Sequence, residues 1–286
     1  QALLVHGISN PYVGRSHFEG QDIMESGVAT PYASSSGWLG RTLDIIGNPS
    51  ITMSLPVPLI LRGKDRPDTD YPSWIKSLPA TMYESLLPLW MADPDLAPFG
   101  QQLEAQKAQL SMAPRIYVGD ANSLQDLAGQ AAKRLTDPAG PRIAVLDHVG
   151  FDSHSNEPSF QSERLREVDD AIGAFQNGMG ELWKDTLVVT VTEFGRTAAE
   201  NGSHGTDHGW GTAVFVVGGK LKKSGIVADW PGLKKKSLFE GRDLMATLDS
   251  RALYGAIISK AFEIDSSRVQ KEILDHQTVD IYDQYI

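Results

Sequence analysis

Short runs of aliphatic and β-branched residues alternate along the chain with segments in which apolar residues recur every three or four positions. The apolar runs predict strands at 2–8, 142–146, 187–192 and 213–217. The three-to-four-residue spacing predicts helices at 36–47, 123–136, 160–183 and 253–262. The strand, helix and strand over 142–192 predict a right-handed parallel crossover. The whole pattern favours an α/β fold with a doubly wound, mostly parallel sheet.

A further helix is predicted to begin at Ser16, directly after the first strand and a turn-rich loop. Ser16 can cap this helix, Glu19 would complete a capping box, and Gly27 would end it. A hydroxyl group at a helix N-terminus is also where many hydrolases present a nucleophile or bind an anion. Both interpretations of Ser16 stay open from this segment alone.

The middle of the chain is less regular than its two ends. Prolines interrupt the apolar segment 51–61, which predicts an edge strand or an extended segment. Residues 62–112 combine a charged loop with two short helical stretches. We therefore predict a single domain over 1–286, with 62–112 as a helical and loop excursion that covers the sheet.

Composition excludes several classes of function. The 286 residues carry a formal net charge of −10, which disfavours a surface that binds nucleic acid through its phosphates. Because the chain has no cysteine, any metal ion must be held by His, Asp, Glu or hydroxyl groups. No run of about 20 apolar residues is present, so no membrane span is predicted.

Polar side chains gather where the predicted strands end or meet a helix. Three groups stand out: Ser16 with His17, Asp152 with His154, and Glu193 with Arg196, Asp207 and His208. The carboxyl ends of parallel strands meet at one edge of a sheet, so these groups can converge. Together they predict a His/carboxylate site for a divalent cation, with Arg196 holding a tetrahedral anion.

Each of these residues also has a structural interpretation. Asp152 could cap a turn, Glu193 could pair only with Arg196, and Asp207 with His208 could form a loop network. Their occurrence after consecutive strands favours a site over separate coincidences. His204, in the NGSHG loop, is expected outside the ligand set.

Several motifs, in this order, resemble a known bacterial family. They are RSHFEGQDIMESG, GFDSH, TEFGRT with NGSHGTDHGWG, EGRDL and TLDSRALYGAI. The chain resembles the family catalogued as domain of unknown function 1501, which is grouped with the alkaline phosphatase and sulfatase superfamily. The resemblance covers nearly the whole chain, and the TEFGRT and GTDHG pair is its most specific part.

The resemblance implies a three-layer α/β/α sandwich with a mostly parallel central sheet and a metal site at its carboxyl edge. It implies Ser16 as nucleophile and Asp152, His154 and His208 as ligands of one metal ion. Glu193 would belong to a second site, where Phe194 stands in place of a histidine and cannot ligate. The early aspartate of that second site would precede residue 1, so one metal ion is expected rather than two.

The expected function is a metal-dependent hydrolase that acts on a small phosphate or sulfate ester. The metal ion would be zinc, manganese, calcium or magnesium. The alternative is an exported, non-catalytic binding or scaffold protein with a degenerate metal site. A serine esterase is disfavoured because no GxSxG motif is present.

Export to the periplasm or the medium is implied by the resemblance, because family members commonly carry a twin-arginine signal. The chain begins without Met and directly with an apolar run. It is therefore expected to lack an upstream strand and a leader. The sequence does not indicate an oligomeric state.

Overall fold

The structure, a computed structural model, divides into two compact units. One comprises residues 1–71 and 123–286, and the other residues 72–122. The described residues are 1–53, 57–64, 67–70, 87–94, 97, 123–277 and 279–286. In the second unit, residues 87–92 are helical, and most of the excursion predicted at 62–112 lies outside the described residues. The candidate site lies in the first unit.

A five-stranded mixed sheet is built around β1 (Ala2–Ser9). The neighbours of β1 are β6 (Thr212–Val217), β7 (Gly225–Val227) and β8 (Leu248–Asp249), and β5 (Val188–Val189) lies beyond β6. β6 pairs antiparallel with both β1 and β5, whereas β7 and β8 pair parallel with β1. Two parallel strands need a crossover connection between them, which is usually a helix. No helix forms in the chain between β5 and β6, and β6 runs antiparallel to β5.

A second, parallel sheet contains β2 (Ser50–Thr52), β3 (Asp68–Thr69) and β4 (Ile143–Val145), in the order β3-β2-β4. β4 and β5 therefore lie in different sheets, although they flank the long helix predicted to join parallel neighbours. The fold class is mixed α/β, as expected. The expectation of one mostly parallel central sheet is corrected to a mixed sheet and a separate parallel one.

The predicted helices form, with shifted ends. They are α2 (Trp38–Ile46), α5 (Leu124–Leu135), α6 (Glu157–Met179) and α7 (Ser250–Phe262). α6 ends before residue 183 because Gly180 takes a φ of 52°, after which the chain tightens into a short 3₁₀ turn. The shorter helical segments are α8 (Ser266–Val269), η1 (Leu59–Leu61), η2 (Gly180–Asp185), η3 (Lys235–Ser237), η4 (Gln270–Leu274) and η5 (Asp280–Tyr282).

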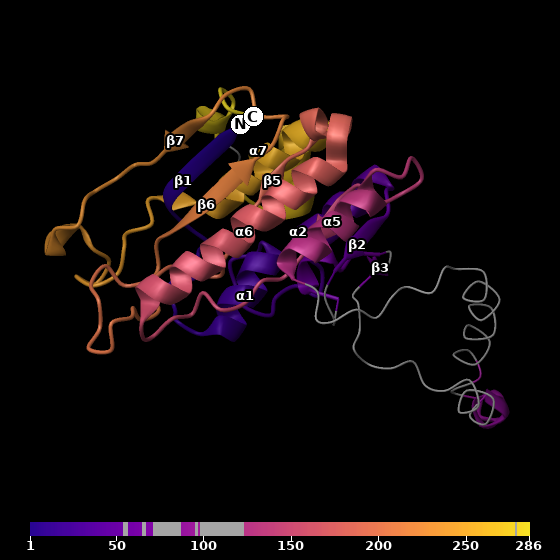
Figure 1. Cartoon of the computed structure of the whole chain (residues 1–286), viewed down its shortest axis with the longest axis horizontal. Helices are drawn as coiled ribbons and strands as arrows, with labels where there is room; N and C mark the ends of the chain where they lie inside the picture. The colour runs from indigo at the N-terminus through magenta and orange to yellow at the C-terminus, as the bar shows by residue number, and fades with distance from the viewer. Residues whose placement is uncertain (54–56, 65–66, 71–86, 95–96, 98–122, 278) are drawn as a thin grey trace. The chain divides into compact units, whose positions relative to one another are not determined.

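Two hydrophobic clusters lie on the two faces of β5. α5 and α6 pack side by side (Figure 1) and bury Ala131 and Phe175 in one cluster. The other cluster contains the buried side chains of β1, β6 and α7. Val188 packs against the first cluster, whereas Leu187 and Val189 pack against the second. Because successive strand residues point to opposite faces, β5 separates the two clusters.

The end of β1 and the start of α1 (His17–Ser26) bring residues toward the site. Gly7, at a φ of 66°, forms the bulge at which the β1–β6 register shifts. Beyond it the buried Asn10 donates to the Glu193 carbonyl at 2.8 Å. Gly27 ends α1 in the left-handed conformation, as predicted.

The predicted capping box at Ser16 does not form, because its side chain makes no cap hydrogen bond. The Tyr12 hydroxyl group takes its place. It accepts the Ser16 backbone N–H at 3.1 Å and donates to Glu19 at 2.5 Å.

Among the helices that the structure describes, none is both long and apolar enough to cross a membrane.

Candidate metal centre

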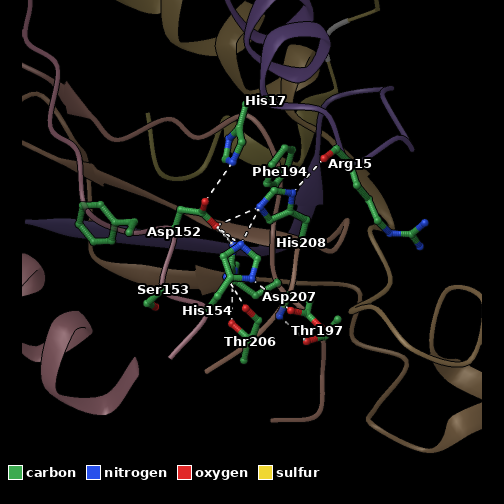
Figure 2. A network of polar contacts seen from close by, with 12 residues as sticks. Arg15, His17, Asp152, Ser153, His154, Phe194, Thr197, Thr206, Asp207 and His208 are labelled. Atoms are coloured by element: carbon green, nitrogen blue, oxygen red, sulfur yellow. Dashed lines mark hydrogen bonds and ion pairs between the residues drawn. The ribbon is translucent and has the colours of Figure 1, made fainter. Parts of the chain in front are cut away.

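Three potential ligand atoms converge in the first unit (Figure 2). Asp152 and His154 lie in the loop after β4, and His208 lies in the loop before β6. Asp152 Oδ1 is 3.0 Å from His154 Nε2 and 3.0 Å from His208 Nε2. The two Nε2 atoms are 3.1 Å apart. The three atoms thus form a nearly equilateral triangle.

The second ring nitrogen of each histidine faces an acceptor. His208 Nδ1 lies 2.9 Å from the Arg15 carbonyl oxygen, and His154 Nδ1 lies 3.1 Å from Asp207 Oδ1. Each Nδ1 atom therefore carries the proton in the neutral ring, and each Nε2 lone pair points toward Asp152. One shared proton cannot satisfy all three contacts among these acceptor atoms, whereas a cation between them can.

This arrangement fits a metal ion in spacing and in donor chemistry. Ligand atoms held ~2.0–2.1 Å from a tetrahedral zinc ion lie about 3.3 Å from one another. The separations here are 3.0–3.1 Å. Metal-bound histidines also typically donate their other N–H to a carboxylate or a backbone carbonyl. Both histidines have such an acceptor.

His17, the first residue of α1, joins this group from the other side of Asp152. Its Nε2 atom is 3.1 Å from Asp152 Oδ2, and its Nδ1 atom is 2.7 Å from Glu193 Oε1. Burial alone would lower the pKa of His17, but its hydrogen bonds to Glu193 and Asp152 outweigh burial and raise that pKa. His17, Asp152 and His208 each place one ligand atom within 4.8 Å of the others and could hold a metal ion.

Phe194 forms an aromatic wall beside these imidazole rings. Its ring centroid is 4.9 Å from that of His17 and 4.7 Å from that of His208. Phe194 is 5% exposed. It therefore shields one side of the imidazole pair from water without supplying a ligand.

Arg196 fixes the Asp152 carboxylate and the following loop. Its Nη1 atom donates to Asp152 Oδ1 at 2.5 Å, and its Nε atom donates to Thr206 Oγ1 at 2.9 Å. Its Nη2 atom also donates to the Thr206 carbonyl oxygen. Burial would raise the pKa of Asp152, but Arg196 and the neighbouring histidines outweigh it and lower that pKa to about 2. The guanidinium group expected to hold an anion is engaged by the protein itself.

Backbone contacts fold the loop at 197–208 onto the loop after β4. Arg196 and His208 pair as an isolated antiparallel bridge, which brackets the loop. Asn201 Nδ2 donates to the His154 carbonyl oxygen at 3.0 Å. A Cβ atom on Gly205 would lie 2.2 Å from the His154 carbonyl carbon, so only glycine permits this approach. The loop thereby fixes the position of the His154 backbone.

A family model described as "Protein of unknown function (DUF1501)" matches residues 97–274, more than half of the chain. The chain belongs to the DUF1501 family. No curated protein and no solved structure matches it. The residues of the centre that lie on the loops after β4 and before β6 fall inside the matched range, whereas those of α1 lie outside it.

Of the four ligands predicted for this DUF1501 chain, the structure brings three together. One ligand atom from each of Asp152, His154 and His208 lies within 3.1 Å of the other two. Glu193 is displaced from that point: the described polar contacts connect it to Asp152 through His17. The prediction from sequence placed Glu193 among the ligands and omitted His17.

Ser16, the predicted nucleophile, immediately precedes His17 at the N-terminus of α1. It is thus one residue from the cluster. The described polar contacts of the Asp152 carboxylate come from His17, His154, Arg196 and His208.

The sequence provides different amounts of information about the residues that were left out of the predicted site. His17 stands beside Ser16 in the first polar group, so it could have been included. Asp207 was noted in the third group, and its role is to accept from His154 and from Asn201, at 3.1 and 3.2 Å. The Arg15 carbonyl group had no detectable signal, because any residue supplies a backbone oxygen.

Other histidines lie outside the triangle, His204 and His148 among them. His204 is 80% exposed on its side chain and pairs with Glu200 at 2.7 Å. His148 contacts Glu167 at 2.8 Å. His204 was expected outside the ligand set, and its pairing with Glu200 makes it a suitable control.

Proposed function

We propose that this DUF1501 chain is a metal-dependent hydrolase of phosphate or sulfate esters. The observation that carries the proposal is the convergence of Asp152 Oδ1, His154 Nε2 and His208 Nε2. The Nδ1 atoms of both histidines already donate, to Asp207 and to the Arg15 carbonyl oxygen. A cluster of this kind serves a cation, and a bound divalent cation stabilises negative charge and activates a hydroxyl group or water for attack.

Two imidazoles and one carboxylate favour zinc or manganese over calcium and magnesium, which prefer oxygen ligands. We propose one ion per chain. Asp152, His154 and His208 would hold it, and Arg196 keeps the Asp152 carboxylate oriented. The exposed fractions of Asp152 and His154, 41% and 47% on their side chains, leave the centre open to an incoming small anionic ester.

Ser16 is the proposed nucleophile. It lies at the N-terminus of a ten-residue helix, where unpaired backbone N–H groups and the helix dipole favour negative charge. Its neighbour His17 reaches Asp152 and Glu193, which fixes the start of the helix beside the cluster. In-line attack by the Ser16 hydroxyl oxygen on phosphorus or sulfur would break the substrate's ester bond, and the departing alcohol would take up the proton that Ser16 loses. Water would then hydrolyse the phosphoryl or sulfuryl ester on Ser16, which releases phosphate or sulfate and restores the hydroxyl group.

The finer fold and the location belong to the same proposal. We propose an alkaline-phosphatase-like α/β/α arrangement, which the two hydrophobic clusters on opposite faces of β5 support. We also propose an exported protein with a twin-arginine signal, which rests on the family resemblance.

Metal analysis tests the metal centre directly. Purified chain should contain about one equivalent of zinc or manganese. His208→Ala should lose it, whereas His204→Ala, a histidine of the same loop outside the cluster, should retain it. Wild-type chain that stays metal-free after incubation with both ions would refute the metal centre.

A screen of aryl phosphates and aryl sulfates tests the chemistry. Metal-loaded chain should hydrolyse one class, and Ser16→Ala should lower the rate by at least roughly a hundredfold while it still binds metal. Ser162→Ala, on the exposed part of α6, is the matched control. Activity that survives Ser16→Ala would exclude Ser16 as nucleophile. Metal binding without any turnover would favour the non-catalytic, exported binding protein.

A further inference from the structure

Asp243 connects two arginines that both hold His208. It is buried, with 1% of its side chain exposed. Its Oδ2 atom accepts from Arg15 Nη2 at 2.8 Å, and its Oδ1 atom accepts from Arg242 Nε at 2.6 Å. A buried carboxylate is stable only when such partners compensate its charge.

Each arginine then contacts a different part of His208. The Arg15 carbonyl oxygen accepts from His208 Nδ1 at 2.9 Å, which sets the ring orientation. Arg242 Nη2 donates to the His208 carbonyl oxygen at 2.5 Å, which sets the backbone. Ring and backbone of one predicted ligand are therefore both fixed by residues that Asp243 holds.

We propose that Asp243 is a positioning residue of the metal centre, which acts on His208 through Arg15 and Arg242. The inference rests on the proposed metal site. It assigns a function to the EGRDL segment, which contains no ligand of the cluster. The residue acts through others and does not touch the metal ion.

The segment around Asp243 also supports Asp207, the carboxylate that accepts from His154 Nδ1. Asp243 forms an isolated antiparallel bridge with Thr197. Thr197 Oγ1 accepts the Asp207 backbone N–H at 3.1 Å, and Asp207 is the acceptor for His154. One segment, in which Asp243 is buried, thus supports the outer contacts of both imidazoles.

A solely structural role is distinguishable from a positioning role. If Asp243 served only stability, its loss would lower the unfolding midpoint of the metal-free chain and leave zinc affinity unchanged in the folded fraction. If it positions His208, zinc affinity falls even when the chain is fully folded. Outer partners of metal-bound histidines typically contribute roughly 10–100-fold to affinity.

The experiment measures zinc dissociation constants of full-length variants by competition with a chromophoric chelator, at temperatures where circular dichroism shows each variant folded. Asp243→Asn should weaken zinc binding by about 10–100-fold. Glu240→Gln, which removes the other and 58% exposed partner of Arg15, should change it by less than about threefold. Equal affinities for wild-type chain and Asp243→Asn would overturn the inference.

A second variant tests the inference in case Asp243→Asn does not fold. Arg242→Gln removes the contact to the His208 carbonyl from a side chain that is 45% exposed. It should weaken zinc binding in the same direction, and an unchanged affinity would overturn the inference independently. Failure of the proposed metal site is recognised separately, because the wild-type chain itself would then bind no zinc, and failure of the proposed hydrolysis leaves these zinc affinities unaffected.

Discussion

Replacing Asp152 by asparagine perturbs both the metal centre and the electrostatics of the metal-free protein. The pKa of Asp152 falls from its ordinary 3.8 to about 2 because Arg196 and the histidines outweigh burial. At ~1.4 kcal/mol for each pKa unit, that shift corresponds to at most roughly 2.5 kcal/mol. Since 41% of the side chain is exposed, solvent screening reduces the expected contribution to about 1 kcal/mol.

The sign of the pH dependence follows from the lowered pKa. A carboxylate whose pKa is lower in the folded state stabilises that state above its ordinary pKa, and the stabilisation is lost as the pH falls toward about 2. In the presence of a chelator, Asp152→Asn should therefore be about 1 kcal/mol less stable than wild type near neutral pH. This difference should decrease steadily below about pH 4.

Zinc should enlarge the difference at neutral pH. A ligand at a hundred times its dissociation constant stabilises the folded state by about 2.7 kcal/mol, and Asp152→Asn should gain much less. The assay is urea unfolding followed by circular dichroism, with chelator or with zinc. Asp170→Asn, at an exposed position on α6, is the control. Equal stabilisation of wild type and Asp152→Asn by zinc would refute the assignment of Asp152 as a ligand.

Three further predictions concern the surroundings of the site and the core. Asp207→Asn should weaken zinc binding by roughly 10–100-fold in the same chelator competition, because the outer acceptor of a ligand histidine loses its charge. Gly205→Ala should destabilise the chain by about 1–3 kcal/mol in urea, since the new methyl group would lie 2.2 Å from a backbone carbon. Gly202→Ala, with open space around it, should be within about 1 kcal/mol of wild type. Trp38→Ala should lower the free energy of unfolding by about 3–5 kcal/mol, because this ring is 5% exposed; the half-exposed Trp230→Ala should cost far less.

The longer helices of the first unit and the strands β1, β4, β5 and β6 could be predicted because their periodicities are local properties of the sequence. The spacing in α6 and the apolar runs of β1 and β6 are examples. The short strands β3, β7 and β8 were not predicted. Strand pairing depends on the connections between strands, which periodicity does not report. The direction of β6 was decided by the absence of a helix between β5 and β6. The separation of β4 from β5 was decided by the pairing of each strand with a strand distant in sequence.

The sequence predicted that Asp152, His154 and His208 converge because all three stand in loops that follow strands. One sheet edge does not explain their convergence, because β4 and β6 lie in different sheets. Their supporting contacts could not be predicted. The Arg15 contact uses a backbone oxygen, and the Asp243 contacts depend on a segment that returns after more than 30 residues.

His17 would let the protein hold the carboxylates of Asp152 and Glu193 with the single metal ion proposed above. Its two ring nitrogens face Asp152 and Glu193, so the ring, when protonated, donates to both and supplies positive charge between them. Phe194 closes the adjacent space with an apolar ring rather than a ligand. A second cation would therefore have to displace His17 from both carboxylates. Two equivalents of metal in the wild-type chain would show that this displacement occurs, whereas one equivalent supports His17 as the permanent partner of Glu193.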